Sequence, residues 1–340
     1  MSSPPVPARS SAQTASATFI ALMVLAVLAA VCSVMFGVRS IGVADALAAL
    51  SGATETPAQA TAWTRIPRTV MAMCVGAALA AAGTTFQAIT RNPLADPGIF
   101  GVLAGAALAI AIGLAFGALG GTFPRIVVAI IGSFAAAAFV YSISSLGRGG
   151  ATPLKLALSG AATAAALSSL TTAIILPRTQ VMDEFRYWQI GSVSGATWEV
   201  LLVAAPALMV GAAIVLASAP GLNALALGDD TATGLGIQVA RTRLIATFGA
   251  VVLCGVATAI AGPIAFVGLI VPHFLRLLLG TDHRVLLPAS LLAGAVVLTA
   301  ADTIGRLLTN PAEVSVGIIT PLLGGPLFIW MARRTKVGQL

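Results

Sequence analysis

The sequence predicts an all-α polytopic membrane protein with about ten transmembrane helices, and its composition and the length of its apolar runs carry this prediction. Of the 340 residues, 58% are hydrophobic and 9% are charged, whereas about a quarter of the residues of a soluble domain are charged. A helix needs about 20 mostly apolar residues to cross a bilayer, and in lipid its backbone must satisfy its own hydrogen bonds. Apolar runs predict spans at 19–36, 69–89, 99–119, 126–146, 154–176, 198–217, 244–261, 264–279, 285–308 and 314–331.

The chain begins with a polar segment that precedes the first apolar run. Residues 1–18 are rich in Ser, Ala and Pro, so we expect a disordered cytoplasmic tail rather than a signal peptide. The run that follows is too long for a typical signal-peptide core and adequate for a membrane span. We expect residues 19–340 to form a single transmembrane domain, within which 220–239 is a cytoplasmic segment.

Two helix starts are indicated by local sequence. Asp96 before Pro97, and Asn310 before Pro311, each combine a capping side chain with a first-turn proline. Glu313 would add a carboxylate to the positive end of the second helix dipole. Helices are therefore expected to begin at these two prolines.

The basic residues predict the topology. An even number of spans puts both termini on one side, and Arg9, Arg333, Arg334 and Lys336 place that side in the cytoplasm. The net charge of +7 does not indicate a nucleic-acid partner, because the basic residues lie between apolar runs. Seven arginines remain on the outer side, where an acidic extracellular partner would account for some of them: Arg39, Arg65, Arg68, Arg125, Arg178, Arg186 and Arg306.

Two segments between spans have a distinct composition. Residues 177–197, on the outer side, mix charged residues with Tyr187 and Trp188, which predicts a non-helical interfacial segment with aromatic anchors. Residues 220–239, on the inner side, are too short and polar to span, and their leucines and alanines recur at about helical spacing. This segment contains Asp229 and Asp230 but no Lys or Arg, whereas membrane-surface helices are usually basic. We therefore expect short amphipathic helices against a protein partner, with a solvated loop as the alternative.

Ionisable residues inside a membrane mark proton or ion pathways, and this sequence places almost none there. All eleven acidic residues lie in loops or near the ends of predicted spans. The deepest is Asp302, which is followed by Arg306 at the i+4 position, so the two can pair on one helix face. The pattern argues against a gradient-driven secondary transporter, which is expected to place a carboxylate near the bilayer midplane.

Residues for metal binding or ATP hydrolysis form no recognisable pattern. Cys32, Cys74 and Cys254 lie inside apolar runs and are interpreted as small buried residues. His273 is interpreted as a polar residue that is hydrogen-bonded to a neighbouring helix. No His, Cys or carboxylate pair has metal-ligand spacing, and no Gly-x-x-x-x-Gly-Lys-Ser/Thr phosphate loop occurs. If the chain moves a substrate across the membrane, the energy must therefore come from another chain or from a gradient.

Several ordered segments resemble one known family. They are RIPR at 65–68, RNPLADPG at 91–98, YWQIGSVSG at 187–195, GPIAFVGLIVPH at 262–273, TDHRVLLP at 281–288 and LGGPLFIW at 323–330. Together they closely resemble the FecCD-type iron-chelate and cobalamin permease family, the transmembrane subunits of type II ABC importers. The resemblance runs from about Arg65 to the C-terminus and implies a ten-helix permease in the cytoplasmic membrane.

The resemblance also implies the partners of the chain. These are two cytoplasmic ATPase subunits, an extracytoplasmic substrate-binding protein, and a second permease subunit that is the same chain or a related one. ATP and Mg²⁺ would be bound by the ATPase subunits, so this chain is expected to bind no cofactor directly, to hold no metal and to be a transport subunit rather than an enzyme.

Three sets of residues match functional positions of the family. Arg65, Arg68 and Arg306 match arginines that dock onto glutamates of the binding protein. The alternatives are snorkelling of Arg65 and Arg68, and a role of Arg306 as the partner of Asp302 alone. The cytoplasmic gate is matched by Asn92, Pro93 and Leu94, with Thr152 nearby. The segment that couples to the ATPase is matched by Leu227, Gly228, Asp229, Asp230, Leu235 and Gly236.

The resemblance leaves the cargo open. Family members carry ferric siderophores, haem or cobalamin, and selection lies mostly in the binding protein. An iron(III)-siderophore, the commonest cargo of the family, is the expectation, with haem or cobalamin as alternatives. A gradient-driven transporter predicts ion-coupled uptake without an ATPase. A membrane scaffold without transport predicts that the docking arginines have no effect on uptake.

Overall fold

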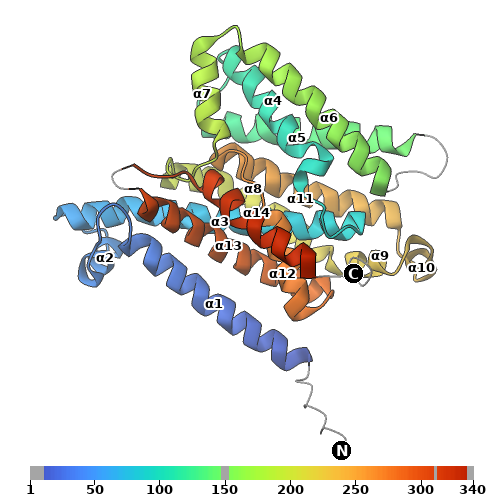
Figure 1. Ribbon diagram of the computed structural model, residues 1–340, viewed down its shortest axis with the longest axis horizontal. Coiled ribbons are helices and arrows are strands. Elements are labelled where there is room, and N and C mark those ends of the chain that lie inside the picture. The colour runs from blue at the N-terminus through green and yellow to red at the C-terminus, as the bar shows by residue number, and fades with distance from the viewer. Residues whose placement is uncertain (1–10, 147–152, 310–311, 335–340) are drawn as a thin grey trace, which may run out of the picture.

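Three long helices form the buried centre of the protein. The computed structural model describes residues 11–146, 153–309 and 312–334, and all regular secondary structure within them is helical. Helix α3 (Pro57–Thr90) packs along both α13 (His283–Leu308) and α11 (Val239–Ala261), and all three lie in the middle of Figure 1. Their buried faces are rich in Ala, Gly and Thr, the small residues that let helix backbones approach closely in lipid.

A pair of glycines permits one such close approach, between α3 and α13. A Cβ atom added at Gly76 would collide with the carbonyl oxygen of Gly294, and one added at Gly294 would collide with the carbonyl oxygen of Gly76. Any larger residue at either position would therefore push the two backbones apart.

Seven further apolar helices surround this centre. Helix α1 lies along one side of it, while α4, α5 and α6 form a group on the opposite side (Figure 1). The bounds of the seven are Ser11–Met35 for α1, Val102–Ala115 for α4, Thr122–Ser145 for α5, Pro153–Ile175 for α6, Trp198–Ala217 for α8, Val267–Leu279 for α12 and Val316–Arg334 for α14. The polar N-terminus of α3 and the short helices lie at the ends of this bundle, where a membrane would give way to water.

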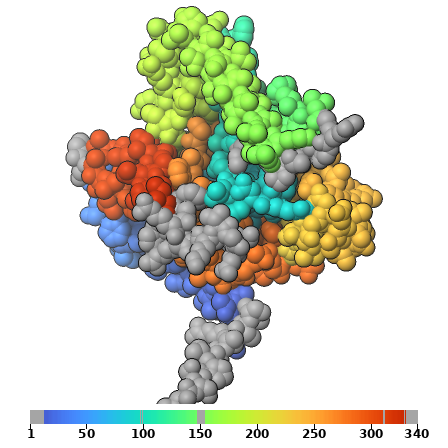
Figure 2. Space-filling view, turned by 45° about the vertical axis from the view of Figure 1, so that its right-hand side comes forward, coloured from blue at the N-terminus to red at the C-terminus, as the bar shows by residue number. Residues whose placement is uncertain are grey.

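The short helices mark the two ends. Helix α2 (Val43–Leu50) lies at the left of Figure 1 and α7 (Thr179–Gln189) at the upper left, whereas α9 (Ala219–Ala226) and α10 (Asp229–Gly234) lie at the right. In Figure 2 the yellow segment that contains α9 and α10 projects from the body of the molecule. The α2 end corresponds to the predicted outer side, and the α9–α10 end to the predicted inner side.

Each of the ten predicted spans corresponds to a helix of the structure. Seven of these helices are long and apolar enough to cross a membrane, and three shorter apolar helices occupy the remaining positions, namely α4, α12 and most of α14. The prediction of about ten transmembrane helices is therefore confirmed by the described part of the chain.

Helix α3 begins well before its predicted start at residue 69. Thr56 caps it by accepting a hydrogen bond from the backbone N–H of Gln59, the Gln59 side chain caps Thr56 in return, and Pro57 occupies the first turn. The first turns of α3 are too polar to register as a span, although they continue the same helix.

Three other expectations are wrong in detail. Residues 11–18, expected to be part of the disordered tail, are helical in α1, and residues 1–10 lie outside the described residues. The segment 177–197, expected to be non-helical, contains α7, whose apolar residues Val181, Phe185 and Trp188 recur at helical spacing, as in a surface helix. The last helix begins at Val316 and not at Pro311. Asn310 and Pro311 themselves lie outside the described residues. At the other predicted start, a helix does begin at Pro97, and Asp96 caps it by accepting a hydrogen bond from the backbone N–H of Gly98 at 2.9 Å. This helix is the short 3-10 helix η1 (Pro97–Phe100).

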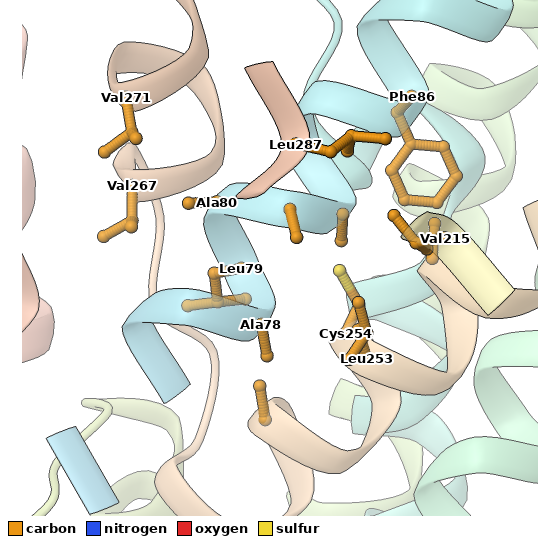
Figure 3. Close-up of a cluster of buried hydrophobic side chains, with 14 of the residues drawn as sticks. Ala78, Leu79, Ala80, Phe86, Val215, Leu253, Cys254, Val267, Val271 and Leu287 are labelled. Carbon is orange, nitrogen blue, oxygen red and sulfur yellow. The ribbon is translucent and has the colours of Figure 1, made fainter. Parts of the chain in front are cut away.

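A buried hydrophobic cluster ties the centre to its neighbours. Phe86 of α3, Leu253 and Cys254 of α11, and Leu287 of α13 belong to it and face one another in Figure 3. Cys254 is buried as predicted, but Cys74 is half-buried and Cys32 is exposed. The prediction is wrong for Cys32 because α1 lies at the periphery, where few of its side chains are covered.

Candidate functional site

A cluster of charged residues occupies the outer end of the bundle. Arg68, near the start of α3, donates from Nη2 to Asp302 Oδ1 at 2.8 Å and from Nη1 to Glu313 Oε2 at 2.6 Å. The Asp302 carboxylate of α13 also forms an ion pair with Arg306, whose Nε lies 3.2 Å from Oδ2. The predicted pair of Asp302 and Arg306 is therefore confirmed, and Arg68 is a second partner of the same carboxylate.

The Arg306 side chain is turned into the protein. It is 1% exposed, and its guanidinium donates to the carbonyl oxygens of Ser33 at 2.9 Å and Phe36 at 3.2 Å, and to Ser33 Oγ at 2.8 Å. Carbonyls in the last turn of a helix have no partner within the helix, so Arg306 completes the C-terminus of α1. In this structure Arg306 is an anchor between α13 and α1, and it is not accessible to another protein.

Arg65 performs the same task from α3. Its guanidinium donates to the carbonyl oxygens of Val34 at 3.0 Å, Met35 at 3.3 Å and Arg39 at 2.8 Å. The three predicted docking arginines thus lie together at one end of the bundle, but Arg65 and Arg306 face inward. Arg68, with 13% of its side chain exposed beside the half-exposed Glu313, is the outermost of the three.

The predicted gate forms a turn at the inner end of α3. Arg91 ends the helix in the left-handed conformation, with φ 49° and ψ 36°. Asn92 Oδ1 then accepts from the backbone N–H of Leu94 at 2.9 Å, and Pro93 between them excludes a further helical turn. The Leu94 side chain is 51% exposed. Thr152, the fourth predicted gate residue, lies outside the described residues.

Arg91 connects this turn to the predicted coupling segment. Its guanidinium forms an ion pair with Asp229, the first residue of α10, and its Nε donates to the carbonyl oxygen of Leu225 in α9 at 2.8 Å. Asp229 also pairs with Arg243 of α11, at 3.0 Å. The gate turn, the coupling segment and the start of α11 are therefore joined through one carboxylate.

The coupling segment presents an apolar surface at the inner end. It folds into the two short helices α9 and α10, as its periodicity predicts. Leu227 is 63% exposed and Leu235 is 62% exposed, on either side of α10. Gly228, at φ 110°, and Gly236, at φ 81°, form the two bends that bound this helix. Asp230 is exposed and makes no ion pair within the described residues, whereas the partly exposed carboxylate of Asp229 is held by the two arginines.

A second polar contact fixes α9 to α13. The Asn223 amide donates to Asp282 Oδ1 at 2.6 Å, and Asn223 Oδ1 accepts from the backbone N–H of His283 at 2.8 Å. The hydrogen bond from Asn223, followed by that from the Arg284 backbone N–H, lowers the pKa of Asp282. The coupling segment is thus held at one point to α13 and at another to the gate turn.

Sequence reasoning did not identify Arg91, Arg243 or Asn223 as parts of this site. Arg91 and Asp229 are 138 positions apart, and no spacing rule relates residues at that separation. His273 was expected to be hydrogen-bonded, but its Nε2 is buried with no partner among the described residues, so that interpretation is wrong for this atom.

The helical fold, the charged cluster at its outer end and the linked turn and short helices at its inner end can be compared with those of known proteins. A solved structure of a metal-chelate type ABC transporter in an inward-facing conformation matches 94% of this chain and all of its own length, with a TM-score of 0.82 and 30% identity. The protein is a multi-pass membrane protein with an ABC importer permease fold.

The sequence matches the FecCD transport family over residues 23–334, and the chain belongs to this family. It is 42% identical over 320 residues to the ferric enterobactin transport system permease protein FepD of Escherichia coli K12, covering 93% of this chain and 95% of FepD. It is 41% identical to the Fe(3+)-citrate import system permease protein YfmD of Bacillus subtilis 168, covering 80% of each chain.

Proposed function

We propose that this chain is the permease subunit of an ABC importer that carries an iron(III)-siderophore across the cytoplasmic membrane. The observation that carries this proposal is the similarity to FepD over nearly the whole of both chains. ATP hydrolysis on a partner subunit would drive the transport, since the sequence contains no phosphate-binding loop of its own.

The inner end supports the ATPase as a partner. Leu227 and Leu235 expose apolar side chains on a projecting segment, and exposed apolar residues rimmed by polar ones are typical of protein contact sites. Movement of α10 under a bound ATPase would reach the Asn92–Leu94 turn through Asp229 and Arg91. This path gives the coupling segment a physical connection to the gate.

The outer end supports a more restricted docking role than the sequence indicates. We assign the contact with an acidic binding protein to Arg68, because it is partly exposed while Arg65 and Arg306 are buried, and because it already holds the surface carboxylate of Glu313. Arg65 and Arg306 act as positioning residues that fix the end of α1. A second permease subunit, the same chain or a related one, would complete the pathway.

The cargo is proposed from the relatives. FepD and YfmD carry iron chelates by name, so a ferric siderophore is the first candidate, with haem and cobalamin as alternatives. Uptake of radiolabelled ferric siderophores, haem and cobalamin into proteoliposomes with the cognate ATPase and binding protein tests the proposal. ATP-dependent uptake of one ferric chelate is expected. Uptake driven by an ion gradient without the ATPase would overturn the proposal.

A further inference from the structure

An apolar cavity lies between α5 and α11 toward the inner end of the bundle. Its volume is about 440 Å³, and aromatic side chains line much of it, among them Phe100, Phe134 and Phe248. The rings of Phe134 and Phe248 lie 4.7 Å apart and bridge the two helices. The polar part of its lining includes Tyr141, Arg241 and Arg243.

The polar and apolar parts of this cavity are separated along the helix axes. Arg241 and Phe248 are seven residues apart on α11, and Tyr141 and Phe134 are seven apart on α5, which corresponds to roughly 10 Å of helix. Because α5 ends and α11 begins at the inner side, the arginines lie at the inner membrane surface and the phenylalanines lie deeper. This is the polarity of a phospholipid, with a charged head and an apolar tail.

The mouth of the cavity carries positive charge that the protein does not neutralise. Asp229 is shared by Arg91 and Arg243, so its single charge cannot balance both. The Arg243 Nε is buried with no hydrogen-bond partner in the described part of the chain. Arg241 is exposed, and within the same part it has no ion-pair partner.

The start of α11 adds to this charge. Arg241 and Thr242 belong to its first turn, which contains no acidic residue, and the Gln238 side chain does not cap it within the described structure. The N-terminus of a helix is its positive end, where free backbone N–H groups favour an anion. Arg241 and Arg243 thus add two positive charges to the positive end of the helix, and an anion would offset them.

We propose that this cavity binds an anionic phospholipid of the inner leaflet. The phosphate group lies against Arg241, Arg243 and the free N–H groups of α11, and the upper part of an acyl chain lies against Phe134 and Phe248. The lining of this site includes neither the predicted gate residues Asn92–Leu94 nor the exposed Leu227 and Leu235. Since Arg243 also holds Asp229, the bound headgroup lies beside the link to the gate.

The test measures lipid occupancy on the intact permease, extracted with its partner subunits into nanodiscs that contain phosphatidylglycerol and phosphatidylcholine. A photoreactive acyl chain on each lipid allows cross-links to be mapped and counted. Phosphatidylglycerol is expected to label α5 and α11 around Phe134 and Phe248. Arg241→Gln is expected to lower this labelling about fivefold, the effect of one arginine near a membrane surface.

Two matched pairs of variants make the result specific. Arg284→Gln removes an exposed inner arginine outside the cavity, and it is expected to leave labelling unchanged. Ala138→Trp fills the cavity and should abolish labelling, whereas Ile143→Trp, at an exposed position of α5 outside the lining, should not. Equal labelling by both lipids, or labelling that is insensitive to both Arg241→Gln and Ala138→Trp, would overturn the proposal.

Discussion

The ion pair between Arg91 and Asp229 joins the turn that ends α3 to the first residue of α10. Arg91 is the residue in the left-handed conformation that breaks the helix, and Asp229 is the residue that begins the projecting helix α10. We therefore expect a displacement of α10 to reach the point where the backbone of α3 changes direction.

The first prediction concerns this link. Asp229→Asn removes the charge that holds both Arg91 and Arg243, so the gate turn should follow α10 less closely. We expect ATP-dependent uptake to fall roughly fivefold while the ATPase stays bound, since exposed ion pairs contribute up to about 1 kcal/mol. Uptake and ATP hydrolysis are measured together in proteoliposomes. Asp230→Asn, at the exposed neighbouring position, is the control, and an equal loss in both variants would show that Asp229 has no special role.

The second prediction concerns the exposed leucines of the coupling segment. Replacing Leu227 and Leu235 together by Ala should weaken binding of the ATPase about tenfold or more, because each buried CH₂ group that is removed from a contact costs about 0.8 kcal/mol. Copurification of the ATPase measures this effect. Leu202→Ala, an equally exposed position on α8, should leave the assembly intact. Unchanged copurification of the double variant would place the ATPase elsewhere.

The third prediction separates Arg68 from its acidic neighbour. If Arg68 contacts glutamates of the binding protein, Arg68→Gln should reduce stimulation of ATP hydrolysis by that protein, more so at low salt, where charge attraction is strongest. Glu313→Gln removes the exposed one of the two carboxylates that Arg68 holds and leaves the pair with Asp302, so stimulation should be retained or increased. If Arg68→Gln and Glu313→Gln reduce the stimulation of ATP hydrolysis equally, the stimulation depends on the ion pair between the two residues and not on a contact of Arg68 with the binding protein.

The fourth prediction concerns stability rather than docking. Arg306→Gln leaves carbonyl groups of α1 and the buried Asp302 with fewer partners, and breaking a buried ion pair costs about 3–5 kcal/mol. The thermal unfolding temperature in detergent should fall clearly. Arg186→Gln, at an exposed position of α7, should have little effect. A stable Arg306→Gln protein that has lost stimulation by the binding protein would restore the direct docking role.

Apolar run length and local rules predicted much of this structure. The ten spans were predicted from the length of apolar sequence that a helix needs to cross a bilayer. The pairing of Asp302 with Arg306 was predicted from their i+4 spacing on one helix face. The polar start of α3 was missed because hydropathy does not register a capped helix that extends beyond the lipid. The inward orientation of Arg65 and Arg306 was missed because it depends on the carbonyl groups of α1, which only the tertiary packing brings to them.

The most direct measurement is uptake of ferric siderophores into proteoliposomes that contain this permease and its ATPase, with the binding protein added from outside. The proposed function predicts uptake of one radiolabelled chelate that requires ATP, the binding protein and an intact Asp229. Uptake that continues without ATP and follows an imposed ion gradient would contradict it.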